Sequence, residues 1–501
     1  MNSHRCGSLK GHTAEDSQNN SSLACNIHHG GRQASGNEIG QKSFPLCFLS
    51  PTKTHFLKLP SAACLIPIQP LQSKSLTFAE KFPMTLNVEV FSEVGDLEAV
   101  IIHTPGSEVE NMTPEDAERA LYSDILNLSV LRQEFVQFSS VLKKFAQVFE
   151  VKDLLAATLK NEKVRNSLIS KVCIPCLDRR TVDGLYQAEP AELARLLIEG
   201  VQQQRDSLSR YLSPQRFAIR PLHNFFFTRD GAATIFDKVL IASTASKVRE
   251  REAQIMEAIF DFHPTFSTST FGAVGEKKPG ENVSIEGGDV IVASEDVLLV
   301  GLSSRTTPAG VDLIVEKMKD RPGKVHIIAQ ELPNDRESFI HLDMVFTFLS
   351  QNECMVYEPV VMQPNRYKTI HIEVDNRKVT ISEEKNILEA LEKLNFELQP
   401  ILCGGKADGW VQEREQWHSG ANFFAIGPGK VIGYSRNVYT IEELNKFGFE
   451  VLAAKDIIKN RVNIQDYRKF VITIEGSELS RGGGGARCMT MPVKRKPVQW
   501  K

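Results

Sequence analysis

The chain has 501 residues, of which 42% are hydrophobic and 24% charged, and its formal net charge is −3. This balance is typical of a globular protein with enough apolar material for a core, so it excludes a chain that is disordered throughout. No run approaches the roughly 18 apolar residues that a membrane-spanning helix needs. The lack of a basic excess argues against nucleic acid as a partner, and the sequence predicts no membrane partner either.

The first 83 residues differ in character from the rest. They contain four of the nine cysteines and five of the twelve histidines, with no sustained helical or strand periodicity. We interpret residues 1–83 as a disordered N-terminal extension, and Met84 could start an independent product. The odd number of cysteines and the missing secretory leader predict free thiols and a cytoplasmic location. Cys173-Ile-Pro-Cys176 has CxxC spacing, but without a second pair it predicts neither a metal nor a redox site.

The next segment changes from strands to helices. Alternating and continuous apolar runs predict strands over 88–94 and 97–102. From about residue 113 to 214, apolar positions recur with a spacing near 3.6 residues, which is typical of amphipathic helices. The predicted helices cover residues 114–121, 130–148, 154–168 and 190–211.

Beyond residue 215 a single pattern recurs. Two short strands are joined by a turn rich in Gly, Asp or Asn, and in most units a helix follows. Such repeats predict a propeller-like ring of α/β units, because each small sheet can bury its faces only against its neighbours. The strand pairs lie within 225–242, 283–301, 341–357 and 421–434, and the helices within 246–260, 308–319 and 440–447.

Polar residues occupy similar places in these units, next to the strand ends. In a ring, such positions would converge on a central channel and surround one small ligand. Carboxylates accept hydrogen bonds only, so they suit a guanidinium group, which offers five N–H donors in a fixed fork. The polar residues are Asn224 and Asp230, then Glu286 and Asp289, then His341 and Asp343, and finally Cys488 near the C-terminus.

Cys488 is the candidate nucleophile. It follows Arg481-Gly-Gly-Gly-Gly-Ala-Arg487, in which the glycines let the backbone approach a neighbour or ligand closely. The attacking species is the thiolate, which Arg487 or a cationic substrate could stabilise. No Lys-Ser/Thr follows the glycines, so a phosphate-binding loop is not expected. Asp289 is interpreted as an ordinary turn residue that caps local backbone N–H groups.

Six motifs taken in order resemble those of arginine deiminases, and the likeness covers residues 84–501. It implies the five-bladed α/β propeller of guanidino-group-modifying enzymes, built from pseudo-fivefold ββαβ repeats. In this interpretation residues 84–138 and 215–501 form the catalytic domain, and residues 139–214 an inserted helical domain. The motifs are His223-Asn-Phe-Phe-Phe-Thr-Arg-Asp230, Ser284-Ile-Glu-Gly-Gly-Asp289, Ser303-Ser-Arg-Thr306, His341-Leu-Asp-Met-Val-Phe-Thr347, Gly420-Ala-Asn-Phe423 and Gly482-Gly-Gly-Gly-Ala-Arg-Cys-Met489.

The resemblance also implies an activity, the hydrolysis of L-arginine to L-citrulline and ammonia without a metal or an organic cofactor. Cys488 would attack the guanidinium carbon, and His341 would protonate the departing ammonia and then activate water. Asp230 and Asp343 would hold the guanidinium nitrogens, and Glu286 would pair with His341.

The same resemblance assigns the other end of the substrate. Asn224, Arg249 and Arg305 match the positions that bind its α-amino acid portion. The arrangement of arginines before the cysteine departs from the family pattern, so Arg481 and Arg487 receive no role. Relatives are commonly oligomers, which predicts a homo-oligomer.

Two alternatives stay open at this point. A deiminase for another guanidine, such as agmatine, or an amidinotransferase would use the same cysteine, histidine and carboxylates. A decarboxylated substrate would leave Arg249 and Arg305 without a carboxylate to bind. The other alternative is a catalytically silent propeller that serves as a binding protein, against which the intact set of reactive residues argues.

Overall fold

The computed structural model describes residues 85–120, 122, 124–172, 177–272, 283–334, 336–406 and 408–500. All of them belong to one compact unit, Thr77–Lys501. The proposed extension, Met84 and the pair Cys173 and Cys176 lie outside the described residues, so the predictions made for them stay predictions.

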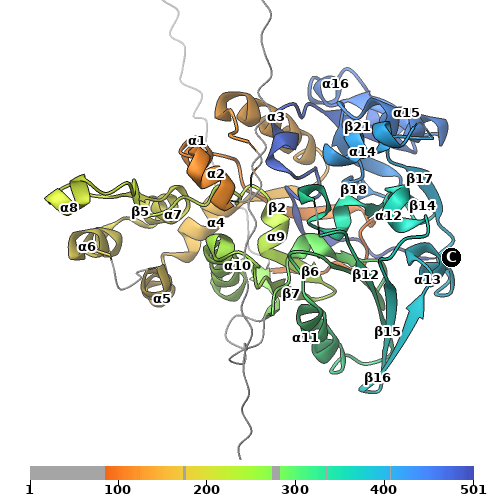
Figure 1. The fold of residues 1–501 in the computed structure, drawn as a ribbon, viewed down its shortest axis with the longest axis horizontal. Coiled ribbons are helices and arrows are strands. Elements are labelled where there is room, and N and C mark those ends of the chain that lie inside the picture. Colours follow the sequence, from red (N-terminus) through yellow and green to blue (C-terminus); the bar gives the residue numbers. More distant parts are fainter. Residues whose placement is uncertain are drawn as a thin grey trace, which may run out of the picture. The chain divides into compact units, whose positions relative to one another are not determined.

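Five sheets share one strand pattern (Figure 1). In each, the first two strands pair antiparallel, and a third strand pairs parallel with the second. The sheets are β6 (Ala232–Ile235), β7 (Lys238–Ile241) and β9 (Ser269–Gly272); β10 (Val290–Val292), β11 (Val297–Leu302) and β12 (Val325–Glu331), extended by β15 (Thr369–Asp375) and β16 (Lys378–Glu384); β13 (Phe346–Phe348), β14 (Glu353–Val356) and β17 (Gln399–Leu402); β18 (Phe424–Gly427), β19 (Lys430–Tyr434), β21 (Phe470–Ile474) and β20 (Glu450–Ala453); and β22 (Met491–Arg495), β2 (Leu97–Ile102) and β3 (Gln147–Glu150).

Helices connect the second strand of each sheet to the third, as a parallel pair requires a crossover connection. Each unit therefore has the order ββαβ. The crossover helices are α10 (Glu250–Phe262); α11 (Pro308–Met318); α12 (Glu358–Val361) and α13 (Ile387–Glu392); α15 (Val438–Lys446) and α16 (Ala454–Ile458); and α1 (Ser107–Glu110), α2 (Pro114–Ala120) and α3 (Leu128–Leu142).

The fifth sheet joins the two ends of the described chain. Its first strand, β22, is the last of the sequence, whereas its second strand, β2, is among the first, with Met491 opposite Ile101. Both side chains are buried in a core cluster that also contains Val88 and Val239. The α/β architecture expected from the sequence is therefore present, while closure of the units into a ring stays a prediction.

A group of helices follows β3 and packs on α10. The apolar faces of α4 and α7 share a core cluster with Ile255 and Ile259 of α10. A short strand pair, β4 with β5, also lies in this part of the chain, and a second pair, β1 with β8, lies outside it. Whether residues 139–214 form a separate domain stays a prediction. These elements are α4 (Val151–Thr158), α5 (Glu162–Val172), α6 (Arg179–Gln187), α7 (Pro190–Glu199) and α8 (Leu208–Tyr211), with β4 (Val201–Gln202) paired to β5 (Phe217–Ile219) and β1 (Leu86–Asn87) to β8 (Phe266–Ser267).

Several predicted boundaries are wrong. The strand expected over 88–94 is reduced to isolated bridges at Glu89 and Val90, and β1 ends at Asn87, just before it. The helix expected over 130–148 ends at Leu142, because the chain then enters β3 and pairs with β2. The helix expected over 190–211 ends at Glu199, where Gly200 adopts a positive φ of 85°. Local periodicity does not reveal either of these endings, since tertiary pairing and backbone conformation set them.

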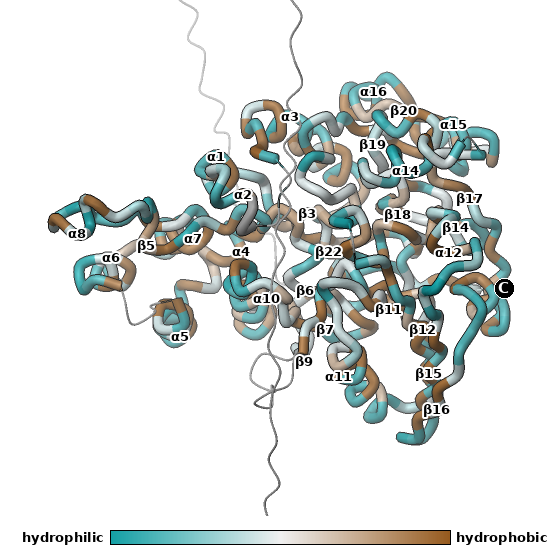
Figure 2. The backbone as a smooth tube through the Cα atoms, viewed as in Figure 1, coloured by the Kyte–Doolittle hydropathy of each residue, from teal (hydrophilic) through white to brown (hydrophobic). Residues whose placement is uncertain are grey.

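Apolar residues concentrate along the strands and on one face of the helices (Figure 2). In α7, for example, Leu193, Ala194, Leu197 and Ile198 are buried. Among the residues that the structure describes, no helix combines the length and apolarity needed to cross a lipid bilayer.

Candidate active site

The expected catalytic residues all lie in the short segments that lead into the first strand of a unit, whereas Arg249 and Arg305 follow the second strand, after β7 and β11. These segments end in a single helical turn or a tight turn immediately before the strand. Five such segments supply the polar side chains, namely Asp230 in α9 (Thr228–Gly231) before β6, Glu286 and Asp289 before β10, His341 and Asp343 before β13, Asn422 before β18, and Arg487 and Cys488 before β22.

His341 lies between two carboxylates. Its Nε2 is 3.0 Å from Oε2 of Glu286, and its Nδ1 is 3.6 Å from Oδ1 of Asp230. Burial by itself would lower the pKa of His341, but the charges of Asp230 and Glu286 raise it to about 9. The pKa of Glu286 is lowered to about 2, since the cationic partners outweigh its burial. The imidazole is therefore charged near neutral pH and can donate a proton.

Gly288 explains why the Glu-Gly-Gly-Asp motif needs glycine beside this pair. A Cβ atom at Gly288 would lie 2.4 Å from Nδ1 of His341. Any other residue would therefore push the imidazole away from its carboxylate partners.

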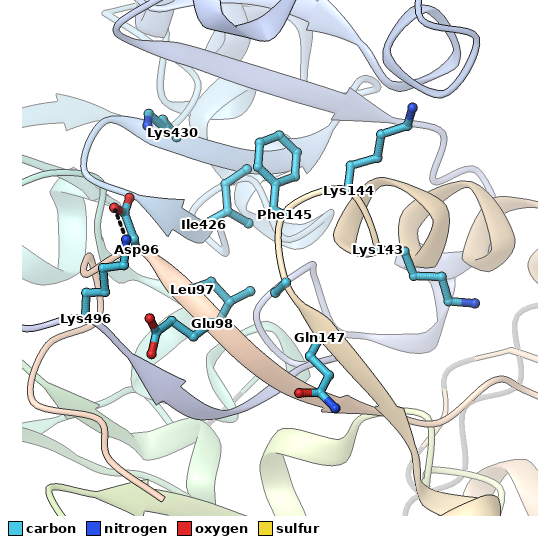
Figure 3. A pocket seen from close by; sticks show the side chains of 11 residues that line it. Asp96, Leu97, Glu98, Lys143, Lys144, Phe145, Gln147, Ile426, Lys430 and Lys496 are labelled. Carbon is cyan, nitrogen blue, oxygen red and sulfur yellow. Dashed lines mark ion pairs between the residues drawn. The ribbon is translucent and has the colours of Figure 1, made fainter. Parts of the chain in front are cut away.

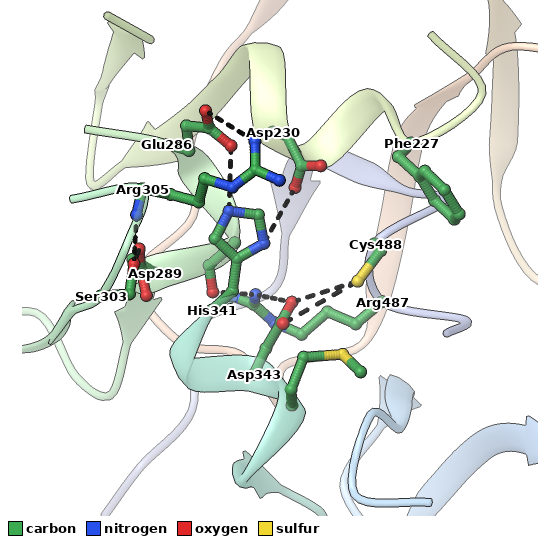
Figure 4. A network of polar contacts seen from close by, with 12 residues as sticks. Phe227, Asp230, Glu286, Asp289, Ser303, Arg305, His341, Asp343, Arg487 and Cys488 are labelled. Carbon is green, nitrogen blue, oxygen red and sulfur yellow. Dashed lines mark hydrogen bonds and ion pairs between the residues drawn. The ribbon is translucent and has the colours of Figure 1, made fainter. Parts of the chain in front are cut away.

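Cys488 is buried opposite His341, with its sulfur directed into the space between Asp230 and Asp343 (Figure 4). The thiol donates toward the Asp343 carboxylate, with Sγ–O distances of 3.7 and 3.8 Å. The side-chain amide of Asn422 donates to Sγ at 3.2 Å. Burial, followed by the negative charges of Asp343 and Asp230, raises the pKa of Cys488 well above its ordinary value.

Arg487 lies under the site and holds one of these carboxylates. Its guanidinium donates to Oδ2 of Asp343 at 2.8 Å and forms a two-point contact with Glu93 at 2.9 and 3.1 Å. The side chain is 1% exposed. Although burial raises the pKa of Glu93, Arg487 and Arg229 lower it to about 2, so the pair is ionised. Arg487 is thus a structural partner of Asp343, a role the sequence left unassigned.

Arg249 belongs to the same network of buried ion pairs. It donates to Oδ2 of Asp230 at 2.6 Å and to Glu252 at 2.8 and 3.0 Å, and its remaining N–H groups meet the backbone carbonyls of Asn224 and Phe227 at 3.4 Å. Although Arg249 begins a run of charged residues that continues to Glu252, its side chain is buried. Arg249 therefore adjoins both Asp230 and the backbone of Asn224.

Arg305 approaches the site from the other side of Glu286, with 3.9 Å between its Nη1 and Oε1 of Glu286. It lines a hollow of about 460 Å³ together with Ser246, Ser304 and Arg336. Of the predicted substrate-binding residues, Arg305 is thus the one that joins a hollow to the buried carboxylates.

Asp289 is more than the local turn residue expected from the sequence. It accepts a hydrogen bond from the backbone N–H of Leu342 at 2.8 Å and another from the Ser303 hydroxyl at 2.6 Å. Burial raises its pKa to about 6. Asp289 therefore ties the segment that carries His341 and Asp343 to the neighbouring unit, which local turn statistics cannot reveal.

Asp230, Glu286 and His341 could in principle surround a metal ion, because one ligand atom from each lies within 4.8 Å of the others. A metal ligand must be an unprotonated imidazole, whereas the two carboxylates favour the protonated form of His341. Arg249 and Arg305 add positive charge within 3.9 Å of Glu286. The donor set is therefore better suited to a guanidinium than to a metal cation.

Another hollow, of about 600 Å³, lies where β2 and β3 begin (Figure 3). It is lined by Leu97, Gln147 and Ile426, with four lysines around them. None of the residues predicted for the site lines it, so it is separate from the network around Cys488.

The profile of the family described as arginine deiminase matches residues 118–495. An arginine deiminase of Listeria monocytogenes serotype 4b (strain CLIP80459) is 32% identical over 437 residues, which cover 84% of this chain and 100% of the relative. The chain belongs to the arginine deiminase family. An arginine deiminase of Streptococcus pneumoniae serotype 19F (strain G54) is also 32% identical, over 432 residues, covering 82% of this chain and 99% of that protein.

The N-terminal domain of ArgZ, described as an arginine dihydrolase from the Ornithine-Ammonia Cycle in Cyanobacteria, is 13% identical, with a TM-score of 0.44 over 80% of this chain and 98% of that chain. A likeness of this size assigns no function to the chain.

Replacing Arg487 by Met should destabilise the fold by about 3–5 kcal/mol, because it leaves Glu93 and Asp343 buried without their cation. Arg481 in the same loop is the matched control. It is 41% exposed and contacts Glu478 and Asp124 at the surface, so Arg481→Met should cost less than about 1 kcal/mol. Thermal melts of both variants measure the difference, and equal melting temperatures would contradict the structural role of Arg487.

His341 should titrate near pH 9, and Glu286→Gln should lower this midpoint by about one unit or more, because it removes a charged hydrogen-bond partner. A pKa raised from 6.5 stabilises the fold below pH 6.5, and this contribution is lost as the pH rises through 9. NMR of selectively labelled histidines measures the titration midpoint of His341 in the wild type and in Glu286→Gln. His326, whose pKa burial lowers, is the internal control and should titrate alike in both proteins. A midpoint of His341 near its ordinary value would contradict the assignment.

Proposed function

We propose that this protein is an arginine deiminase that hydrolyses L-arginine to L-citrulline and ammonia. The observation that carries the proposal is the convergence of a cysteine, a charged imidazole and two carboxylates, Asp230 and Asp343, on one buried space. Membership of the family and the names of the relatives support the same activity.

The two aspartates would hold the planar guanidinium of the substrate. Oδ1 of Asp230 is buried, and within the described residues it lacks a hydrogen-bond partner. Asp343 adjoins the sulfur directly. Carboxylates on two sides can accept N–H bonds from a guanidinium and leave its carbon open to attack from a third side. The sulfur of Cys488 then lies on that third side (Figure 4).

The positive charge of the substrate would also favour ionisation of the thiol. The two neighbouring carboxylates disfavour a thiolate, and they raise the pKa of Cys488 together with burial. A guanidinium bound between them would neutralise their charge and favour the thiolate. The nucleophile would therefore be generated only when the substrate is present, with the thiol proton passing through Asp343 to solvent.

The chemistry then proceeds in two halves. The thiolate adds to the guanidinium carbon, protonated His341 gives its proton to one NH₂ group, and ammonia leaves as the amidino-thioether forms. Neutral His341 next accepts a proton from water as the water oxygen adds to the same carbon. Collapse of this adduct breaks the C–S bond, restores the thiolate and gives protonated citrulline, whose extra proton ammonia takes up as ammonium. No metal or organic cofactor enters these steps.

The amino acid end of the substrate would extend toward the hollow lined by Arg305. Arg305 would bind the carboxylate, because within the described residues its guanidinium is paired only at 3.9 Å, with Glu286. Asn224 and Arg249 complete the proposed set. Arg249 is already paired with Asp230 and Glu252, so contact with a substrate carboxylate would require it to exchange one of these partners.

We also propose that the five ββαβ units close into a five-bladed propeller. The equivalent placement of site residues before the first strand of each unit supports this arrangement, since only a closed ring brings all five segments to one axis. The pairing of β22 with β2, which completes one unit from both chain ends, supports it too. A homo-oligomer in the cytoplasm, with no nucleic-acid or membrane partner, remains a prediction from the sequence.

A second candidate is a deiminase for another guanidine, or an amidinotransferase, because the reactive groups would be the same. Arg305 favours a substrate that carries a carboxylate. A silent binding protein would need neither the charged pair of His341 and Glu286 nor a cysteine beside it.

Cys488→Ala should abolish citrulline formation, because it removes the atom that forms the covalent intermediate. The matched control is Cys354→Ala, since Cys354 is also buried but lies in β14 among apolar residues. A colorimetric citrulline assay should give no turnover for the first variant and near-normal turnover for the second. Mass spectrometry of the wild type mixed with arginine should place an adduct on Cys488. Citrulline formation by the Cys488→Ala variant would refute the assignment.

Arg305→Ala should weaken use of arginine more than use of agmatine, because agmatine has no carboxylate to lose a partner. We expect kcat/KM for arginine to fall by roughly 10- to 100-fold, the value of a lost charged hydrogen bond. Citrulline and carbamoyl-putrescine formation are measured side by side. An equal loss on both substrates would show that Arg305 does not bind the carboxylate.

A further inference from the structure

One of the five converging segments has no role in the reaction described so far. The segments before β6, β10, β13 and β22 supply Asp230, Glu286, His341 with Asp343, and Cys488. The segment before β18 carries Asn422, which occupies the equivalent place in its unit and is 1% exposed. Asn422 is thus the side chain that the fifth segment contributes to the site.

The contacts of Asn422 fix the orientation of its amide. Oδ1 accepts hydrogen bonds from the backbone N–H groups of Arg487 at 2.9 Å and Cys488 at 3.4 Å. Because backbone N–H groups can only donate, the oxygen must face them and the NH₂ group must face the other way. Nδ2 then donates to Sγ of Cys488 and to the backbone carbonyl of Asp343, both at 3.2 Å.

The glycine run lies close against this amide. A Cβ atom at Gly485 would lie 2.5 Å from Oδ1 of Asn422. The nucleophile loop therefore reaches Asn422 only because residue 485 has no side chain. The lack of a side chain at Gly485 therefore allows the backbone before Cys488 to pack against the amide of Asn422.

We propose that Asn422 is a further catalytic residue, whose Nδ2–H stabilises the Cys488 thiolate and whose Oδ1 holds the nucleophile in position. The proposal rests on the proposed function, since it concerns the same sulfur. A hydrogen bond donated to a charged acceptor is stronger than one donated to a neutral acceptor, so the amide favours the thiolate over the thiol.

The other groups around the sulfur do not replace this donor. Asp343 and Asp230 are negative and oppose ionisation of the thiol. The guanidinium of Arg487 favours the thiolate, but its N–H groups are committed to Glu93, Asp343 and backbone carbonyls. The hydroxyl of Tyr434 donates to the backbone carbonyl of Gly484, and the backbone of Gly485 makes a further favourable contact with Cys488. Asn422 thus supplies a side-chain N–H aimed at the reacting atom.

Two variants remove the donor in different ways. Asn422→Asp keeps the shape and the accepting oxygen but replaces NH₂ with a second oxygen, and Asn422→Ala removes both functions. The matched control is Asn437→Asp, the same change at another buried asparagine, whose amide donates to the backbone carbonyl of His418 and contacts none of the site residues.

The first measurement does not depend on arginine. Iodoacetamide reacts with thiolates, so peptide-resolved mass spectrometry of Cys488 alkylation at a pH where all proteins stay folded reports the thiolate fraction. We expect about tenfold slower alkylation in Asn422→Asp, and a wild-type rate in Asn437→Asp. The second measurement is citrulline formation, for which both Asn422 variants should lose roughly 10²-fold in kcat with little change in KM.

The outcomes separate this proposal from the proposed function. Slower alkylation in Asn422→Asp supports the role of Asn422 even if the wild type forms no citrulline, which would refute only the arginine deiminase activity. A wild-type alkylation rate in a folded Asn422→Asp variant overturns the role of Asn422. Loss of the fold in both variants, judged by thermal melts, also overturns it, because Asn422 would then be a structural residue.

Discussion

The structure depends on the compensation of buried charge. Several carboxylates are brought into the interior around one small space, where an unpaired ion would be prohibitively costly. Each has a cationic neighbour: Arg487 bridges Glu93 and Asp343, Arg249 bridges Asp230 and Glu252, and His341 lies between Asp230 and Glu286. The positive side chains lower the pKa values of Glu93 and Glu286 to about 2, and the neighbouring acids keep His341 protonated. The charges that would bind a cationic substrate are therefore held ready by the fold itself.

The same compensation sets the reactivity of Cys488. Its nearest charged group is negative, so the thiol is poorly ionised until a cation is bound between the aspartates. A neutral donor such as the amide of Asn422 can assist the thiolate without drawing the aspartates away from a guanidinium. An arginine at this place would compete for the same carboxylates. This explains in physical terms why Arg487 points its guanidinium toward Glu93 and Asp343, below the sulfur, although it is the residue next to Cys488.

Sequence reasoning named the candidate reactive residues, which the structure brings close together, but not all of their partners. His341, Asp343 and Cys488 stand in recognisable motifs, and their types alone suggest nucleophilic and acid–base chemistry. Asp289 was interpreted as a local turn residue, whereas it binds the backbone of Leu342, 53 residues away. Asn422 lies in the motif Gly420-Ala-Asn-Phe423. Its place before the first strand of its unit was the signal that could have identified it as a site residue. The periodicity indicated two strands and a helix in each repeat, and the third strand of the ββαβ unit was expected only from the resemblance to the family.

The sequence by itself determined the α/β class, the recurring strand pairs, the helical stretch after residue 113 and the cysteine, histidine and carboxylates of the site. The strands and helices follow from the periodicity of neighbouring residues. The candidate site residues follow from the chemistry of their side chains. Only the tertiary structure decided that α3 ends where β3 pairs with β2, that β22 completes a sheet with β2, and which cation meets which carboxylate. Those features arise from contacts between residues that are not neighbours along the chain, such as Arg487 and Glu93, which are 394 positions apart, and no local pattern encodes such a pairing.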